Sequence, residues 1–247
     1  MPIIHSIIKL GAFVSMIVVL PSIPVVAQDG PRVFQVPDGC TAFLTVQSRS
    51  CFVSHHWTCE NDPAGTHWRV SADEEGPFYL SFTDTEFRWL RSWDLRNDIQ
   101  GTLVEPEDDP ANLTELLATG SDSMVFSMLQ EGPLGQERRD YTGFDRLTGE
   151  NVVVDGQTLM VTDFSYQYDT SDGPRRTQGN QFVHEDWRIF FGGVETTTLP
   201  NGEEFEGNYS PMDFAAPGED GFLAMQPIYD CGAVMSSLTR PESGGNG

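Results

Sequence analysis

Lysine is almost missing from this 247-residue chain: Lys9 is the only one, against 37 Asp and Glu. Without lysine, the rest of the chain cannot form a Schiff base, a Ser–Lys dyad or a phosphate-binding P-loop. The formal charge of −23 also opposes a phosphate backbone and an anionic bilayer. We therefore expect no nucleic-acid partner and no charge-driven membrane docking.

Familiar catalytic motifs are missing as well. The chain has no Gly-x-Ser-x-Gly, His-Glu-x-x-His, Gly-x-Gly-x-x-Gly or Cys-x-x-Cys pattern and no EF-hand loop. These absences make an enzyme less expected without excluding one, and nothing in the sequence indicates a cofactor.

The N-terminus has the features of a secretory signal peptide. Residues 1–27 contain no acidic residue, and their apolar run from Leu10 to Val19 is shorter than the ~20 residues that span a bilayer. Prolines follow the run, and small residues precede a cleavage site between Ala27 and Gln28. The sequence predicts a periplasmic or secreted protein of charge −24, with no membrane span after cleavage; the alternative is an uncleaved anchor.

All four cysteines lie in the predicted exported part, where an even count favours two disulfides. Three connectivities are possible. Cys51 and Cys59 on one strand would lie roughly 26 Å apart, too far to bond. A hairpin that turns near residues 48–51 instead places Cys40 opposite Cys59. We therefore favour the pairs Cys40–Cys59 and Cys51–Cys231.

The same hairpin predicts a register for the first two strands. In a tight turn at Arg49-Ser50, Ala42 lies opposite Trp57, Leu44 opposite His55, and Val46 opposite Val53. One mostly apolar face results. Arg49-Ser50 is not the Asn-Gly type that a two-residue turn prefers.

Alternating apolar residues recur along the chain and indicate a mainly antiparallel β fold. Examples are Met124/Phe126/Met128 and Met160/Thr162/Phe164/Tyr166/Tyr168. Turn signals separate such runs, at Asp155-Gly156, at 171–174 and at Asn201-Gly202. The pattern predicts a meander of hairpins in a single domain over residues 28–239, with a disordered tail at 240–247.

Two segments need separate treatment. Residues 110–118 predict a short helix, with Asp109 as N-cap, Pro110 at the first helical position and Gly120 just past the end. Residues 87–95 suit either a strand or a helix, and we favour a strand.

Ten to twelve strands have to curl, close or stack to hide their edges, which leaves a barrel, a half-barrel, a curved sheet or a sandwich. Sequential hairpins favour the curled forms, whose concave face can hold a small ligand. Large apolar residues at alternate positions would line it; the alternative is that they only fill the core. The candidate lining residues are Met160, Phe164, Tyr166, Trp187, Ile189 and Phe191.

Histidines and arginines supply weaker candidate sites. His184 and Asp186 share a strand face and could contribute to a metal or hydrolase site, although we favour the alternative that such histidines pack beside tryptophan. We assign no metal ligand. The arginines at 88, 91 and 96 alternate with Trp89 and Trp93, and could meet an anion or a sugar or only form solvated ion pairs.

Three segments carry a resemblance: Cys51-Phe-Val-Ser-His-His-Trp-Thr-Cys59, Gly143-Phe-Asp-Arg-Leu-Thr-Gly149 and Pro227-Ile-Tyr-Asp-Cys-Gly232. There the chain resembles a family of uncharacterised exported proteins of alphaproteobacteria. The resemblance implies export and a shared fold and assigns no site residue. The hairpin pattern is also similar, at the level of fold alone, to lipocalins and to half-barrel lipoprotein carriers.

These observations lead to one expectation and two alternatives. The expectation is an exported soluble protein that binds an apolar or amphipathic, lipid-like small molecule. The first alternative is a structural or protein-partner module of the cell envelope that uses Trp89 and Trp93; the partner itself is unknown. The second is a hydrolase or metalloenzyme that uses His184 and Asp186.

Overall fold

The computed structural model describes residues 32–232, which belong to one compact unit. The predicted signal peptide at 1–27 and the predicted tail at 240–247 lie outside the described residues.

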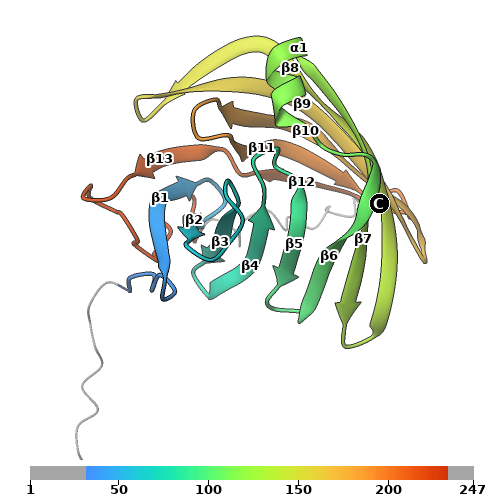
Figure 1. Ribbon diagram of the computed structural model, residues 1–247, viewed down its shortest axis with the longest axis horizontal. Coiled ribbons are helices and arrows are strands. Elements are labelled where there is room, and N and C mark those ends of the chain that lie inside the picture. The colour runs from blue at the N-terminus through green and yellow to red at the C-terminus, as the bar shows by residue number, and fades with distance from the viewer. Residues whose placement is uncertain (1–31, 233–247) are drawn as a thin grey trace, which may run out of the picture. The chain divides into compact units, whose positions relative to one another are not determined.

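Thirteen antiparallel strands form a single sheet, in which each strand from β1 to β12 pairs with its neighbour in sequence and β13 pairs with β1 (Figure 1). This arrangement confirms the predicted mainly β meander. The strands are β1 (Cys40–Ser48), β2 (Phe52–Cys59), β3 (His67–Asp73), β4 (Gly76–Thr83), β5 (Trp89–Asp94), β6 (Ile99–Asp109), β7 (Ser121–Gly132), β8 (Gly135–Val154), β9 (Gln157–Thr170), β10 (Gly173–His184), β11 (Ile189–Thr198), β12 (Glu204–Asn208) and β13 (Pro211–Ala215), with one helix, α1 (Leu113–Thr119).

The sheet curls but does not close. In Figure 1 the long strands β8 and β9 arch over while β13 returns beside β1. Only Tyr209 and Ser210 separate β12, on the β11 edge, from β13, on the β1 edge. Their backbones bridge the edges, because Tyr209 N–H donates to Gly193 O (2.8 Å) and Arg49 N–H donates to Ser210 O (3.0 Å). No ladder joins β12 to β13 in the described residues, so a closed barrel is wrong and a curved open sheet is correct.

Turn chemistry explains the hairpins. Asp155 and Gly156 both have positive φ (45° and 76°), as the two-residue turn between β8 and β9 requires. The turn at Asn201-Gly202 separates β11 from β12, as predicted. These short connections explain why sequential strands are spatial neighbours throughout.

The first hairpin corrects the predicted register. Cys40 pairs with Cys59 and Ala42 with Trp57, as expected, but a bulge follows Ala42. Beyond it Leu44 pairs with His56 rather than His55, and Val46 with Ser54 rather than Val53. A bulge places one extra residue in one strand, here Phe43, and so shifts all later pairs by one. The turn has three residues, 49–51, rather than two.

The two ambiguous segments are now resolved. Residues Trp89–Asp94 form a strand, as favoured, but its pairing with β4 shifts between Arg91 and Trp89. The helix begins at Leu113 rather than Pro110, because Asn112 is the N-cap: its side-chain oxygen accepts from Glu115 N–H at 2.9 Å. Asp109, the predicted cap, lies in β6 instead, and Gly120 ends the helix as predicted.

The ends of β9 and β11 are buried on both faces. Leu159 and Ile189 pack in one cluster with Leu44 and Phe214, from β1 and β13. Phe190 packs in a second cluster with Leu116 of α1. Because adjacent strand residues point to opposite faces, this stretch lies between the first strand and the helix. Packing across these elements holds the curl.

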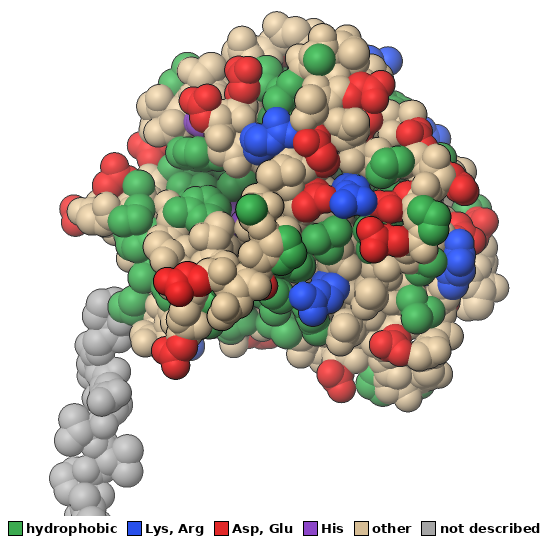
Figure 2. All heavy atoms as spheres, viewed as in Figure 1, with side chains coloured by type: hydrophobic (Ala, Val, Ile, Leu, Met, Phe, Trp, Pro, Cys, Tyr) green, Lys and Arg blue, Asp and Glu red, His purple; other side chains and the backbone are tan. Residues whose placement is uncertain are grey.

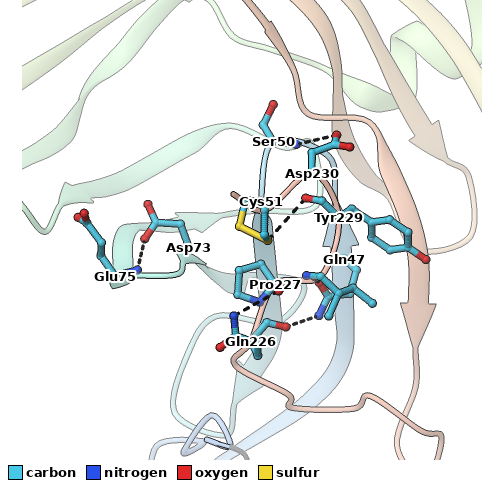
Figure 3. The surroundings of a disulfide bond; sticks show 11 residues. Gln47, Ser50, Cys51, Asp73, Glu75, Gln226, Pro227, Tyr229 and Asp230 are labelled. Carbon is cyan, nitrogen blue, oxygen red and sulfur yellow. Dashed lines mark hydrogen bonds between the residues drawn. A yellow bond between two sulfur atoms is a disulfide. The ribbon is translucent and has the colours of Figure 1, made fainter. Parts of the chain in front are cut away.

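Both predicted disulfides are present: Cys40–Cys59 joins β1 to β2, and Cys51–Cys231 closes a separation of 180 residues. Figure 3 shows the second bond and the segment around it. Gln47 binds this segment through both side-chain atoms, donating to Gln226 O (3.1 Å) and accepting from Ile228 N–H (3.2 Å). The C-terminal segment is thus fixed to the first hairpin by one covalent and several polar links.

Candidate ligand-binding cavity

A cavity of about 90 Å³ lies on the concave face beside α1. It extends along β5 to β9, with Phe190 of β11 and Leu113 of α1 at its inner end. A water molecule needs roughly 10–15 Å³ on the same scale, so the space admits a group of several heavy atoms.

Eight of the twenty residues that line the cavity are aromatic. Phe126 and Tyr141 stack with ring centroids 4.9 Å apart, and Trp89 meets Phe126 and Tyr166 edge-on at 6.4 and 6.3 Å. Phe164 lies 6.0 Å from Tyr166 along β9. Such contacts restrain one another, so the wall is preformed and presents both ring faces and ring edges to a ligand.

Trp89 and Tyr141 also line a second, adjoining space of about 200 Å³. Its walls are more polar and include Gln130 and Arg139. Burial raises the pKa of Tyr166 to about 12 and raises that of Tyr141 still further, so both hydroxyls stay neutral at physiological pH. The two spaces together form an aromatic cavity with one polar end.

A network of ion pairs forms the rim near α1. Arg188 lies 3.0 Å from Glu86, whose carboxylate also accepts from Thr114 N–H at 2.8 Å. Arg88 contacts Asp84 at 2.7 Å and Glu107 at 3.2 Å. Among the charged lining residues, Glu86, Glu107 and Arg88 therefore each have an oppositely charged partner. Glu86 pairs with Arg188, and Glu107 pairs with Arg88.

Two other lining carboxyls lack a cationic partner. Asp122 and Asp145 lie directly opposite each other on β7 and β8. Burial raises the pKa of Asp122 to about 6 against the lowering effect of Asn112 N–H, which donates at 2.8 Å. Burial, and then the charge of Asp122, raises the pKa of Asp145 to about 7. Perturbed carboxyls in a cavity mark a candidate functional site.

The structure places the six predicted lining residues on two different sides of the sheet. Phe164 and Tyr166 line the cavity, and Met160 packs against the helix cluster next to it. The other three, Trp187, Ile189 and Phe191, pack with Phe214 on the opposite side of β11. Alternation along β11 explains the division, since Phe190 and not its neighbours points to the cavity side.

Sequence reasoning missed most of the wall, including Trp89, Phe126, Tyr141, Asp122 and Asp145. The alternation Met124/Phe126/Met128 was visible, and counting back from the 132–135 turn pairs Asp122 with Asp145. Because the chain has 37 Asp and Glu, this pairing alone does not identify Asp122 and Asp145 as a site.

The histidines lie mostly in the packed region. His56 and His67 stack at 5.9 Å, and burial lowers the pKa of His67 to about 4 and that of His56 well below its ordinary value. His184 stacks on Trp187 at 3.8 Å, and both its ring nitrogens have protein neighbours, Gln157 Oε1 (3.3 Å) and Trp187 N–H (3.2 Å). These contacts support the interpretation that the histidines are packed aromatic side chains.

One group of potential metal-binding atoms occurs within the described residues, formed by Cys51, Glu74 and Cys231. Both sulfurs belong to the disulfide, so they are not thiolate ligands. Within residues 32–232, no helix has the length and apolar character needed to cross a membrane.

The fold and the cavity together define an open, curved β meander with an aromatic, acidic pocket. No family model, curated protein or solved structure matches the chain. The two disulfides indicate an oxidising, non-cytoplasmic location.

Proposed function

We propose that this protein is an exported soluble binding protein that holds an apolar or amphipathic small molecule in the cavity beside α1. The preformed aromatic wall carries the proposal, because binding sites for small organic molecules are typically concave, apolar and fitted with a few polar groups. Export to the periplasm or the exterior fits the disulfides and the predicted signal peptide.

The two alternatives rest on residues that the structure places in other surroundings. Trp89 lines the cavity, and Trp93 packs on Trp68 at 5.6 Å, so neither forms a free docking surface. The edge strand β12 is five residues long and carries Glu204 and Glu206, features that oppose edge-to-edge pairing. His184 and Asp186 gain no third ligand in the described region.

Native mass spectrometry of protein purified without denaturant gives the first test, with a bound small-molecule mass as the expected result. The second test is a fluorescence titration with the neutral probe N-phenyl-1-naphthylamine. Binding is expected for the unmodified chain and strongly reduced in Met124→Trp, because Met124 lines the cavity and the indole fills it.

Val125→Trp is the matched control, since Val125 is the next residue of β7, is 36% exposed and does not line the cavity. We expect it to bind the probe like the unmodified protein. A clean apo mass together with no probe binding, or equal binding by Met124→Trp and Val125→Trp, would overturn the proposed function.

A further inference from the structure

The cavity contains a carboxyl group without a partner. Asp145 is only 9% exposed and lines the cavity, yet its side chain has no hydrogen bond or ion pair within the described residues. Buried carboxylates are normally paired with a cation or held by several donors. Asp145 therefore presents an unsatisfied acceptor to whatever occupies the space.

A second carboxyl next to Asp145 also has no cationic partner within the described residues. Asp122 faces Asp145 across the β7–β8 ladder, where Cβ atoms of directly opposed residues lie about 4.5–5.5 Å apart. Its one hydrogen bond comes from the neutral backbone of Asn112. Like charges at this spacing repel each other, and no guanidinium of the described chain pairs with either.

The nearest arginines are engaged elsewhere. Arg88, which lines the cavity beside α1, contacts Asp84 and Glu107, and Arg139, which lines the adjoining space, contacts Glu137 at 2.8 Å. Arg146 follows Asp145 in β8 and therefore points to the other face, where it contacts Asp163 at 3.4 Å. The described part of the chain therefore supplies no positive charge to the pair.

The remaining walls suit an organic cation rather than a bare metal ion. Aromatic ring faces attract cations within about 6 Å, most strongly when desolvated. The cavity is lined by Trp89, Phe126, Tyr141 and Tyr166, while no third carboxylate or histidine joins the pair in a metal-binding group in the described part of the chain.

We propose that the ligand of this cavity is an amphipathic organic cation, a quaternary or protonated amine with an apolar body, whose charge sits against Asp145 and Asp122. This inference rests on the proposed function and specifies its ligand class. The apolar body contacts the aromatic wall, and the ammonium supplies the missing counter-charge.

Affinity for a permanent cation should then depend on pH. Protonation removes the negative charge of Asp145 and Asp122, so binding weakens as the pH falls from 8 to 5. The other charged groups around the cavity are Glu86, Arg88, Glu107, Asp109, Glu115 and Arg188, with Arg139 in the adjoining space; Arg188 contacts Glu86, and Arg88 contacts Glu107.

A competition experiment tests the ligand class with two probes of nearly equal shape. Benzyltrimethylammonium and its neutral carbon isostere neopentylbenzene each displace N-phenyl-1-naphthylamine at pH 8 in moderate salt. We expect the cation to act at a concentration about tenfold or more below that of the isostere. The preference should disappear in Asp145→Asn and shrink in Asp122→Asn.

Asp163→Asn provides the matched control, because it removes one negative charge from the outer face of the next strand. It should keep the full preference, which separates the cavity charge from the general acidity of the chain. Equal displacement by the cation and the isostere, with N-phenyl-1-naphthylamine still bound, overturns the cation assignment and leaves the proposed function standing. A preference that survives in both cavity variants also overturns it. Absence of probe binding overturns the proposed function itself.

Discussion

Two regions of the curved sheet are stabilised in different ways: one lies at the edge formed by β1 and β13, and the other surrounds the cavity in the middle of the strand order. We call them the disulfide end and the cavity end. The disulfide end, which we define as β1–β3 with β13, has both disulfides and a packed core of aromatic and histidine side chains. The cavity end, β5–β9 with α1, has no disulfide and contains two adjoining cavities and an unpaired acidic couple. None of the residues that line these cavities comes from the disulfide end.

The difference indicates that the stability of the domain and its cavity depend on different regions of the sheet. A buried carboxyl without a partner costs free energy, and a cavity loses packing contacts. A domain tolerates both only if stability comes from elsewhere, since the net stability of a domain is about 5–15 kcal/mol. We expect the crosslinks and packing of the disulfide end to supply it, so that the cavity end can hold the proposed ligand.

Removing the long-range disulfide, Cys51–Cys231, should produce the largest change in the free energy of unfolding. In Cys51→Ala/Cys231→Ala the unfolded chain loses a constraint across 180 residues, and we expect the free energy of unfolding to fall by about 5 kcal/mol in urea denaturation. Cys40→Ala/Cys59→Ala, which opens a separation of 19, should lose about 3 kcal/mol. At low urea, folded protein of both variants should still bind N-phenyl-1-naphthylamine; loss of binding would show that the two ends are not independent.

Neutralising one carboxyl of the acidic pair Asp122 and Asp145 should instead increase the free energy of unfolding. Asp145→Asn removes a buried charge that repels Asp122, so the ligand-free protein should gain about 2 kcal/mol of unfolding free energy at pH 8. The exposed control Asp163→Asn should stay within about 0.5 kcal/mol of the unmodified protein. A destabilised Asp145→Asn would mean that the carboxylate has a structural partner.

The pH dependence of stability should separate the two ends. The folded state raises the pKa of Asp145 to about 7, so it binds the proton more tightly than the unfolded state, and the contribution of Asp145 alone to stability rises by about 1 kcal/mol as the pH falls from 8 to 6. The folded state lowers the pKa of His55 and His67 to about 4, so their contribution to stability is lost as the pH falls from 6.5 toward 4.

Urea unfolding at pH 8, 6 and 4.5 measures both trends. The difference in stability between Asp145→Asn and the unmodified protein isolates the first trend: it should shrink by about 1 kcal/mol between pH 8 and 6, while both proteins keep the loss due to the histidines. If the variant and the unmodified protein follow parallel curves, the raised pKa of Asp145 is wrong.

The smallest effect is expected at the helix cap. Asn112→Ala removes the acceptor for Glu115 N–H and should cost about 1 kcal/mol, because a cap satisfies one otherwise free backbone donor. Asn112→Asp keeps the acceptor and is the control. Hydrogen exchange should show faster exchange confined to α1 and the neighbouring cavity wall; an effect spread over β1 and β2 would contradict the separation of the two ends.

Local patterns were enough to predict the disulfide pairing and the first hairpin of the disulfide end, but not its register. The spacing of Cys40 and Cys59 around one turn determined their pairing, and alternation with turn residues identified the meander. The bulge at Phe43 was not predictable, because an extra residue in a strand leaves no mark on an apolar run. It shifted every pair beyond Ala42.

The cavity end depended on information that the sequence does not carry locally. Which residues of β9 and β11 face the cavity depends on the register of β9, β10 and β11, which puts Phe164 and Tyr166 on the opposite face from Ile189 and Phe191. In the same way, an acidic pair in a chain with many carboxylates becomes informative only when burial and missing partners are known.

The most direct test of the account is a methyl NMR titration that compares the two ends in one sample. With the methionine methyl groups labelled, N-phenyl-1-naphthylamine should shift the signals of Met124 and Met128, which line the two cavities, through its ring currents. Met212 in β13 and Met225 near the long-range disulfide should not move. Shifts at Met212 or Met225 that equal or exceed those at Met124 and Met128, or a saturable titration that leaves the two cavity methionines unchanged, would contradict it.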